Sequence, residues 1–204
     1  MAKDNRIVVA VTGASGAAYA RRLLQCLSRA DVHTDLIISR HGRELLAEEL
    51  GITNPTPGAL VGSEAAASVT LHAHADVGAP PASGSFRTNG MVICPCSSNT
   101  LAEIAAGMGT NLIARAAAVH LKEARRLILL TRETPCSQID LRNMLRISKA
   151  GGIICPASPG FYMRPKTIDD LVDFVVGRLC DLLGVEHTFD TRWDPHRPRR
   201  SDGA

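Results

Sequence analysis

The sequence predicts an α/β fold, a Rossmann-like doubly wound parallel sheet in a single domain, and three observations support this prediction. The chain has 204 residues, which suits one compact domain. Short apolar runs typical of buried strands alternate with stretches of helical periodicity. Glycine, serine and proline clusters separate these segments. Because ligands of such folds bind beyond the carboxyl ends of the strands, we expect the polar motifs to gather there.

The first half of the chain predicts two strands, each followed by a helix. The strands are Arg6–Thr12 and Val32–Ser39. The helix after Gly16 is indicated by apolar residues at positions i, i+3, i+4 and i+7, namely Ala20, Leu23, Leu24 and Leu27. A short helix is expected at about His41–Leu50. The segment from Ile52 to Gly90 is the least regular and predicts at most one short strand, near Val69.

Regular alternation resumes after Gly90. The predicted strands are Met91–Cys94, Leu127–Thr131 and Gly152–Cys155, and the predicted helices are Leu101–Ala106, Leu112–Lys122, Gln138–Lys149 and one that starts at Thr167. Ser137 and Asp140 are spaced as a capping box, and Leu141, Met144 and Leu145 supply the apolar positions of the helix that follows. The last helix carries one broad apolar stripe, formed by Ile168, Leu171, Val172, Val175, Val176, Leu179 and Leu183. We expect residues 1–188 to form the domain and residues 189–204 a polar, basic arm.

Composition argues against several classes of protein. Hydrophobic residues make up 45% and charged residues 21%, which excludes wholesale disorder. Aromatic residues are only 3% and the net charge is +3, so we expect no nucleic-acid partner. No apolar run approaches the ~20 residues that span a bilayer, and no secretory signal is recognisable at the start. A cytoplasmic protein without a membrane partner is the expectation.

Cysteine and histidine spacing gives no sign of a metal site. The six cysteines do not form the paired clusters of a structural zinc site, and we interpret all six as small buried hydrophobic residues. They are Cys26, Cys94, Cys96, Cys136, Cys155 and Cys180. His72 and His74 lack a third ligand at suitable spacing, so a solvated loop pair is favoured over a metal site.

A glycine-rich turn follows the first predicted strand. In Gly13-Ala14-Ser15-Gly16 the glycines allow close approach of a ligand, Ser15 offers a hydroxyl, and the following helix N-terminus attracts phosphate. The dinucleotide pattern GxGxxG is absent, and the second strand ends in Ser39-Arg40, where an NAD-binding unit would have an acid. The turn therefore favours a mononucleotide over NAD, although a tight turn without a ligand remains the alternative.

A second polar motif, Pro95–Thr100, follows the strand that ends at Cys94. It places Ser97, Ser98, Asn99 and Thr100 where hydroxyls and helix-start amides can hold a phosphate or the polar edge of a ring. Helix capping by Ser98 or Asn99 would explain one of these polar residues but not all four.

These motifs resemble those of a known family. The run Pro95–Thr100, followed by Gly107, Asn111 and Leu112, is similar to the Pro-Ala-Ser-Ala-Asn-Thr signature of the homo-oligomeric flavin-containing cysteine decarboxylase superfamily. Within that superfamily the chain resembles the flavin prenyltransferases, on the segments Ser83–Ser85, Leu121–Arg126, Arg132–Pro135, Pro159–Tyr162 and Arg164-Pro165. The Pro-x-Met-Asn-x-x-Met clamp of the cysteine decarboxylase branch is absent.

The resemblance implies a reaction, a cofactor and partners. Members of the family join a dimethylallyl group from dimethylallyl monophosphate to N5 and C6 of reduced FMN, without a metal. The product, prenylated FMN, serves a partner decarboxylase. The family assembles as a homo-dodecamer with sites shared between subunits. The resemblance leaves two alternatives open: an FMN-dependent decarboxylase of a cysteinyl carboxylate, and a non-catalytic flavin-binding accessory subunit.

The resemblance also implies roles for individual residues. FMN would be bound by Gly13, Ala14, Ser15, Ser39, Ser97, Ser98, Asn99, Thr100 and Arg132. The prenyl phosphate would be bound by Arg115, Lys122, Arg132, Tyr162 and Arg178. Glu49, Lys122 and Glu133 would be catalytic. From the residues alone, only Arg132 stands out, because it directly follows an apolar strand; Glu49 reads as a surface acid and Tyr162 could be a core ring beside Phe161.

Two further features bear on function. Asp169-Asp170-Leu171-Val172-Asp173 matches the DDxxD pattern of metal-dependent prenyl synthases, but Thr167 and Asp170 are spaced as a capping box, so helix capping is the favoured interpretation. Val77 stands where some family members have a tryptophan, and Ala114 and Ala118 stand where many have acids. These departures put the efficiency of the reaction in doubt rather than its class.

Overall fold

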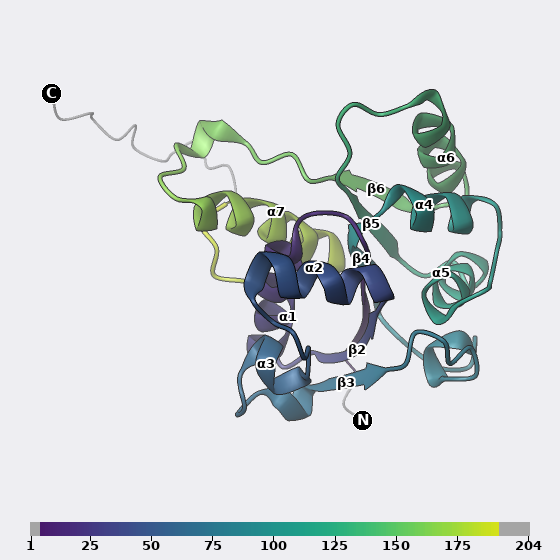
Figure 1. The fold of residues 1–204 in the computed structure, drawn as a ribbon, viewed down its shortest axis with the longest axis horizontal. Coiled ribbons are helices and arrows are strands. Elements are labelled where there is room, and N and C mark those ends of the chain that lie inside the picture. Colours follow the sequence, from purple (N-terminus) through teal and green to yellow (C-terminus); the bar gives the residue numbers. More distant parts are fainter. Residues whose placement is uncertain (1–4, 192–204) are drawn as a thin grey trace, which may run out of the picture.

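A computed structural model describes residues 5–191 and contains one six-stranded parallel sheet (Figure 1). The strand order is β3-β2-β1-β4-β5-β6. The strands are β1 (Arg6–Val11), β2 (His33–Ile38), β3 (Val69–His72), β4 (Gly90–Cys96), β5 (Leu127–Thr131) and β6 (Ile153–Pro156). The order reverses between β1 and β4, so the loops that follow these two strands meet at the switch point of the sheet, where ligands of doubly wound folds bind.

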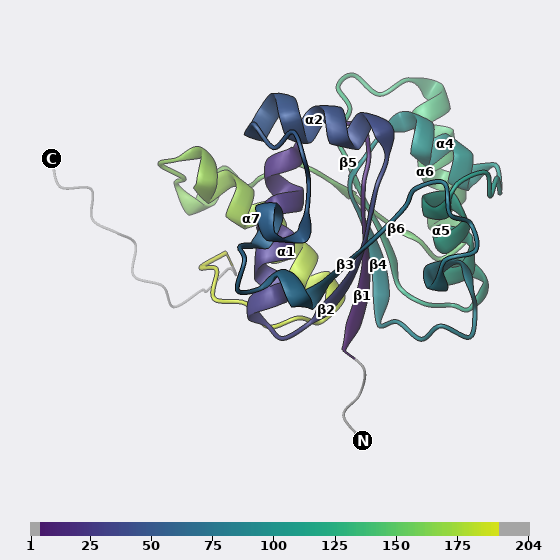
Figure 2. The same ribbon diagram turned by 60° about the horizontal axis from the view of Figure 1, so that its bottom comes forward.

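Helices cover both faces of the sheet (Figure 2). One face packs against α1 (Ala17–Arg29) and α7 (Ile168–Leu183), and the other against α4 (Ser98–Ala105), α5 (Leu112–Lys122) and α6 (Gln138–Lys149). The remaining helical elements are α2 (Arg40–Leu50), α3 (Pro57–Val61), η1 (Ala66–Ser68), η2 (Pro80–Ala82) and η3 (Phe161–Met163). The α/β prediction is therefore confirmed, and none of the described helices is long and apolar enough to cross a membrane.

The predicted bounds hold well in the regular segments. The structure places α5, β5 and α6 at the predicted residues, and it confirms both capping boxes, Ser137 with Asp140 and Thr167 with Asp170. The segment expected to be irregular contains α3 in addition to the short strand near Val69. Thr56 caps α3 and Pro57 begins it, a local signal present in the sequence.

Two predicted apolar faces are wrong in part. Asn143 and Ile147 are the buried residues of α6, whereas Leu141 and Leu145 are exposed. Ile168, placed on the apolar stripe of α7, is exposed as well, because it lies in the first turn of the helix, ahead of the buried stripe. The rotation of α6 about its axis follows from the packing of Ile147 in the core of that face of the sheet.

The interpretations of the cysteines and of His72 need correction. Cys136 is exposed and Cys155 is half-buried, while the other four cysteines are buried. His72 is not in a solvated loop, because it lies in β3 with its Nε2 2.8 Å from the Asp35 carboxylate. Arg6 donates to the other oxygen of Asp35 at 2.9 Å. Burial alone would raise the pKa of Asp35, but the hydrogen bonds from His72 and Arg6 outweigh it and hold the pKa below its ordinary value.

A buried histidine makes stability depend on pH. His120 on α5 is buried, with Nδ1 2.7 Å from the Ala116 carbonyl oxygen and Nε2 2.8 Å from the Thr88 hydroxyl. Burial lowers its pKa, so just below pH ~6.5 the unfolded chain binds a proton that the folded chain does not. We expect the free energy of unfolding to fall as pH drops from 7 to 5, by up to about 1.4 kcal/mol per pH unit. Urea unfolding at several pH values measures this dependence. In His120→Gln the free energy of unfolding should fall less between pH 7 and pH 5 than in the wild type, and an equal fall would contradict the assignment to His120.

Candidate active site

A buried threonine joins the loops that follow β1 and β4. The Thr12 hydroxyl donates to the Pro95 carbonyl oxygen at 2.8 Å and accepts from the Ser97 amide at 2.8 Å. Thr12 was not among the residues predicted from the sequence, although it follows an apolar strand and directly precedes a glycine. This bridge fixes Gly13–Gly16 relative to Ser97–Thr100.

Thr12→Val should destabilise the fold while preserving the shape of the side chain. Valine leaves the Ser97 amide without its buried partner and leaves the Pro95 carbonyl oxygen with only the Thr12 backbone amide, at 3.2 Å. We expect a loss of about 1–3 kcal/mol in the free energy of unfolding. Urea unfolding measures this loss. Thr12→Ser keeps the hydroxyl and is the matched control, expected to lose less. A Thr12→Val variant as stable as the wild type, with a loss in Thr12→Ser, would show that the methyl group, not the bridge, stabilises this region.

The N-terminus of α1 binds a carboxylate of the same chain, that of Glu49. The Glu49 carboxylate accepts from the amide of Gly16 at 3.2 and 3.1 Å and from the amide of Ala17 at 2.8 Å. Gly16 has φ +124°, and a Cβ there would lie 2.8 Å from the Tyr19 ring, so glycine is required. From the residues alone, Glu49 was interpreted as a surface acid. In the structure, α2 brings it to the Gly13–Gly16 turn. These amides form a preformed site for negative charge.

The turn after β1 and the start of α2 approach each other closely. A Cβ at Gly13 would lie 2.6 Å from the Cβ of His41, so only glycine fits. The Ser39 amide donates to the Val11 carbonyl oxygen at 2.9 Å, and the Ser39 hydroxyl accepts from the Gly42 amide at 3.0 Å. Ser39 therefore lies beside the glycine turn, as predicted, and it also caps α2.

The polar motif after β4 begins α4. Ser97, rather than Ser98 or Asn99, is the N-cap: its hydroxyl accepts from the Thr100 amide at 3.3 Å and donates to the Thr100 hydroxyl at 3.1 Å. The Ser98 hydroxyl donates to the Glu133 carboxylate at 3.0 Å, and Asn99 is exposed. Capping of α4 thus explains Ser97 and Thr100, but it does not explain Ser98 or Asn99.

Arg132 and Glu133 follow β5 and close the group. Arg132 donates from Nε to the Ser15 carbonyl oxygen at 3.4 Å, and Glu133 accepts from the Ser98 hydroxyl. Both side chains are exposed. Hydrogen bonds from Ser137, and to a smaller extent from Ser98, lower the pKa of nearby Asp140, so this carboxyl is charged at neutral pH. The strand-end cluster is defined here as Gly13–Gly16, Ser39, Glu49, Ser97–Thr100, Arg132 and Glu133.

Lys122 does not lie in this cluster, which corrects the expectation that all polar motifs gather at the carboxyl edge. It is the last residue of α5 and precedes the amino end of β5, whereas Arg132 follows the carboxyl end. A strand of five residues is about 16 Å long, so the two basic residues lie at opposite edges of the sheet. The Lys122 ammonium lies 3.7 Å from a Glu123 carboxylate oxygen and faces Gly84, in the predicted motif Ser83–Ser85.

Among residues 5–191, no hydrogen bond or ion pair joins Arg115, Tyr162 or Arg178 to the strand-end cluster. Arg115 is exposed in the first turn of α5. Tyr162, in η3, is 60% exposed, and its ring meets Phe174 of α7 edge-on at 5.8 Å. Arg178 is exposed one helical turn after Phe174. Tyr162 therefore packs on α7, the helix that carries Arg178.

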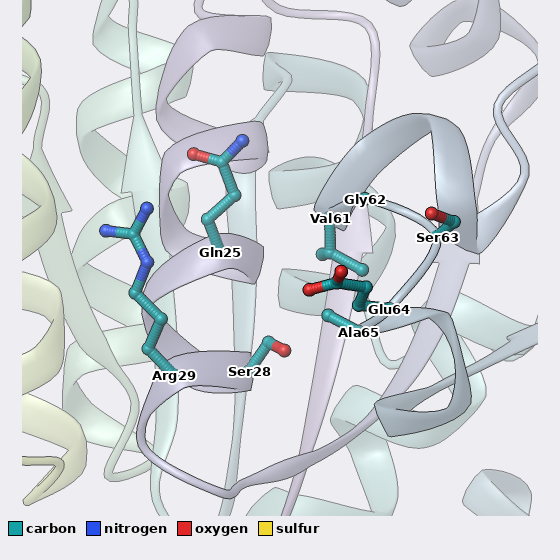
Figure 3. A pocket seen from close by; sticks show the side chains of 8 residues that line it. All are labelled: Gln25, Ser28, Arg29, Val61, Gly62, Ser63, Glu64 and Ala65. Atoms are coloured by element: carbon teal, nitrogen blue, oxygen red, sulfur yellow. The ribbon is translucent and has the colours of Figure 1, made fainter.

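Three cavities of the described part of the chain lie away from this cluster. Figure 3 shows a cavity of about 340 Å³ between α1 and the segment after α3, lined by Gln25, Ser28, Arg29, Val61, Gly62, Ser63, Glu64 and Ala65. Two cavities of about 570 and 590 Å³ lie at the amino edge of the sheet, around Asn89. None of the three is lined by a predicted site residue. Among residues 5–191 no group of three or more histidine, cysteine or acidic side chains is placed to hold a metal ion.

A doubly wound sheet with a glycine turn, hydroxyls and an arginine at its switch point defines a nucleotide-binding class of protein, and comparison with known proteins makes the class specific. A sequence model of the Flavoprotein family matches residues 1–180. The flavin prenyltransferase UbiX of Halalkalibacterium halodurans is 47% identical over 196 residues, 95% of each chain. The chain belongs to the Flavoprotein family and to the UbiX flavin prenyltransferases.

Solved structures agree with this placement. The crystal structure of AnUbiX (PadA1) in complex with FMN and dimethylallyl pyrophosphate superimposes with a TM-score of 0.85 at 42% identity, covering 94% of this chain and 98% of that one. The dodecameric FMN-dependent UbiX-like decarboxylase of Escherichia coli O157:H7 gives a TM-score of 0.83 at 41% identity, covering 93% and 99%.

Proposed function

We propose that the chain is a flavin prenyltransferase that joins a dimethylallyl group from dimethylallyl monophosphate to N5 and C6 of reduced FMN. The single observation that carries this conclusion is the strand-end cluster at the switch point of the sheet, in a chain 47% identical to a flavin prenyltransferase. FMN supplies the nucleophilic ring when bound, and the product, prenylated FMN, serves a partner decarboxylase. The protein acts in the cytoplasm.

The donor groups of the cluster fit a phosphorylated flavin. Amides at the start of α1 and the hydroxyls of Ser15 and Ser39 suit an anion, and Ser97–Thr100 offers polar atoms to a ring edge. Gly13, Ala14 and Arg132 complete this set. Arg132 is exposed at the same edge, where it can pair with negative charge. Glu133 and Glu49 would be the acids that move protons, a role that needs no metal.

The donor phosphate would be bound by residues from more than one copy of the chain. Arg132 belongs to the strand-end cluster, whereas Arg115, Lys122, Tyr162 and Arg178 lie outside it in the same chain. A second copy would supply at least Lys122, which lies at the opposite edge of the sheet from Arg132, as expected for a family whose sites are shared between subunits. The related structure from Escherichia coli is a dodecamer, which supports assembly of this chain into a homo-oligomer. Cations around the departing phosphate would stabilise the transition state.

Anaerobic incubation with reduced FMN and dimethylallyl monophosphate, followed by mass analysis of the extracted flavin, tests the proposal. We expect a flavin heavier by one five-carbon unit, formed equally well in EDTA. Dimethylallyl pyrophosphate, the compound bound in the AnUbiX structure, is the second donor to compare. Unmodified FMN that remains bound would instead favour the two alternatives, a cysteinyl decarboxylase or an accessory subunit. A product that forms only with added Mg²⁺ would contradict the metal-independent reaction.

A further inference from the structure

Two buried cysteines on different helices meet on one face of the sheet. Cys26 lies on α1 and Cys180 on α7, and these two helices pack side by side (Figure 2). The two Sγ atoms are 3.4 Å apart, although the cysteines lie 154 positions apart in the sequence. Cys26 is 6% exposed and Cys180 is 0% exposed. The sulfur atoms of a disulfide are about 2.05 Å apart, so an approach of about 1.4 Å would join these two.

The surroundings make Cys26 the more acidic thiol of the pair. The Cys180 thiol donates a hydrogen bond to the Cys26 sulfur, and this bond is the main reason why the pKa of Cys26 lies below its ordinary value. Arg22 and Arg29, four residues before Cys26 and three after it on α1, lower this pKa further, whereas burial and Asp173 oppose them. The same hydrogen bond and burial raise the pKa of Cys180. One sulfur therefore has thiolate character and its neighbour keeps its proton.

The other buried cysteines lack this arrangement. Burial raises the pKa of Cys94 and of Cys96, so both thiols stay protonated. Cys96 donates to the Ser97 carbonyl oxygen at 3.6 Å rather than to another cysteine. Buried thiols that keep their proton react slowly with oxidants, because the thiolate is the nucleophile. Packing as small hydrophobic residues is sufficient to explain Cys94 and Cys96, but it does not explain the contact between Cys26 and Cys180.

We propose that Cys26 and Cys180 form a modification site, which hydrogen peroxide converts into a disulfide that links α1 to α7. The Cys26 thiolate attacks one peroxide oxygen, an S–O bond forms, the O–O bond breaks, and the departing hydroxide takes up the proton that Cys26 has lost. The Cys180 sulfur then attacks the Cys26 sulfur, an S–S bond forms and the S–O bond breaks. The second hydroxide takes the Cys180 proton. In sum the two thiols lose two electrons and two protons, and hydrogen peroxide becomes two molecules of water.

A cavity brings solvent close to both cysteines. The cavity of about 570 Å³ at the amino edge of the sheet is lined by Ala30 and Leu183, which lie one helical turn after Cys26 and Cys180. A molecule as small as hydrogen peroxide fits this space. Reduced flavins form hydrogen peroxide when dioxygen oxidises them, so reduced FMN would supply the oxidant near the protein. The inference rests on the proposed function only for this source of peroxide.

The first test counts thiols before and after exposure to hydrogen peroxide. A Cys136→Ser chain lacks the exposed cysteine and keeps five of the six. After treatment, denaturation and labelling with a maleimide, we expect two fewer labels, restored by dithiothreitol, and a peptide pair that joins Cys26 to Cys180. Adding Cys180→Ser should abolish this pair, whereas adding Cys155→Ser, at a half-buried cysteine, is the matched control and should retain it. Five labels after treatment, or a pair that contains Cys94 or Cys155, would overturn the proposal.

The second test measures thermal unfolding of the oxidised and reduced Cys136→Ser chain. A bond between residues 154 positions apart restricts the unfolded chain, so we expect the oxidised form to unfold about 5–15 °C higher. Dithiothreitol should remove this shift, and Cys180→Ser should not show it. An oxidised form no more stable than the reduced form would show that the packing of α1 on α7 does not accommodate the bond, and would overturn the proposal. Both tests use added peroxide and no flavin, so a failure of prenyl transfer would leave their results unaffected.

Discussion

Lys122→Ala is expected to slow prenyl transfer about 1,000-fold while leaving FMN affinity within about twofold of wild type. Loss of one preformed charge that stabilises a transition state costs on the order of 10² to 10³ in rate. FMN affinity should persist, because Lys122 lies at the amino edge of the sheet, about 16 Å from the strand ends where FMN is proposed to bind. Single-turnover assays with mass detection, together with flavin fluorescence titration, measure the two quantities separately. Weakened FMN binding by Lys122→Ala would contradict the prediction that Lys122 affects the rate of prenyl transfer but not the affinity for FMN.

Mixing variants tests whether two chains share one site. Lys122→Ala and Arg132→Ala chains, each inactive alone, should recover about a quarter of wild-type activity when co-expressed in equal amounts. A mixed site is intact when its Arg132 comes from a Lys122→Ala chain and its Lys122 from an Arg132→Ala chain. In a random assembly of symmetric subunits each condition is met for about half of the sites, so both are met for about a quarter. Arg132→Ala mixed with Glu133→Gln is the control, because both residues follow β5 and no mixed site has both. Recovery in neither mixture would show that Lys122 and Arg132 act within one chain.

The strand-end cluster could be predicted because it depends on topology. Carboxyl ends of parallel strands share one edge, so a polar residue directly after an apolar run, such as Ser39 or Arg132, is placed by its position in the sequence alone. The separation of Arg132 and Lys122 could also be predicted from the sequence, because Arg132 follows the strand Leu127–Thr131 and Lys122 precedes it. The resemblance grouped them in one site, whereas the fold places them at opposite edges of the sheet within one chain.

Other features depended on contacts that no local pattern records. Helical periodicity identified α6, but the choice between Leu141 and Ile147 as its buried side followed from packing on the sheet and α4. The bridge from Thr12 to Pro95 and Ser97 joins residues more than 80 positions apart. Glu49 reads as a surface acid until α2 is placed over the start of α1. Each of these features arises from long-range packing, which periodicity and spacing do not report.

Glu49→Gln is expected to separate the rate of prenyl transfer from the affinity for FMN. The Glu49 carboxylate accepts three hydrogen bonds from the amides of Gly16 and Ala17 at the positive end of α1. Glutamine keeps an oxygen acceptor there but removes the negative charge. An anion near a helix N-terminus interacts by about 0.3–1 kcal/mol, so removal of the competing charge should tighten binding of the FMN phosphate by about two- to fivefold. A proton-transfer role predicts, in contrast, a rate about 100-fold lower.

Single-turnover rates and flavin titrations of Glu49→Gln and Glu48→Gln test this separation. Glu48 is exposed and adjacent in sequence, so its variant controls for the loss of one surface charge on α2 and should leave both quantities near wild type. Rate and affinity that decline together in Glu49→Gln would show that the carboxylate only holds the Gly13–Gly16 turn in place. A slower reaction on more tightly bound FMN requires that Glu49 leave the α1 amides when the phosphate arrives, because one set of donors cannot serve two anions. The carboxylate that occupies the helix end before FMN binds would then become free to transfer a proton once FMN is bound.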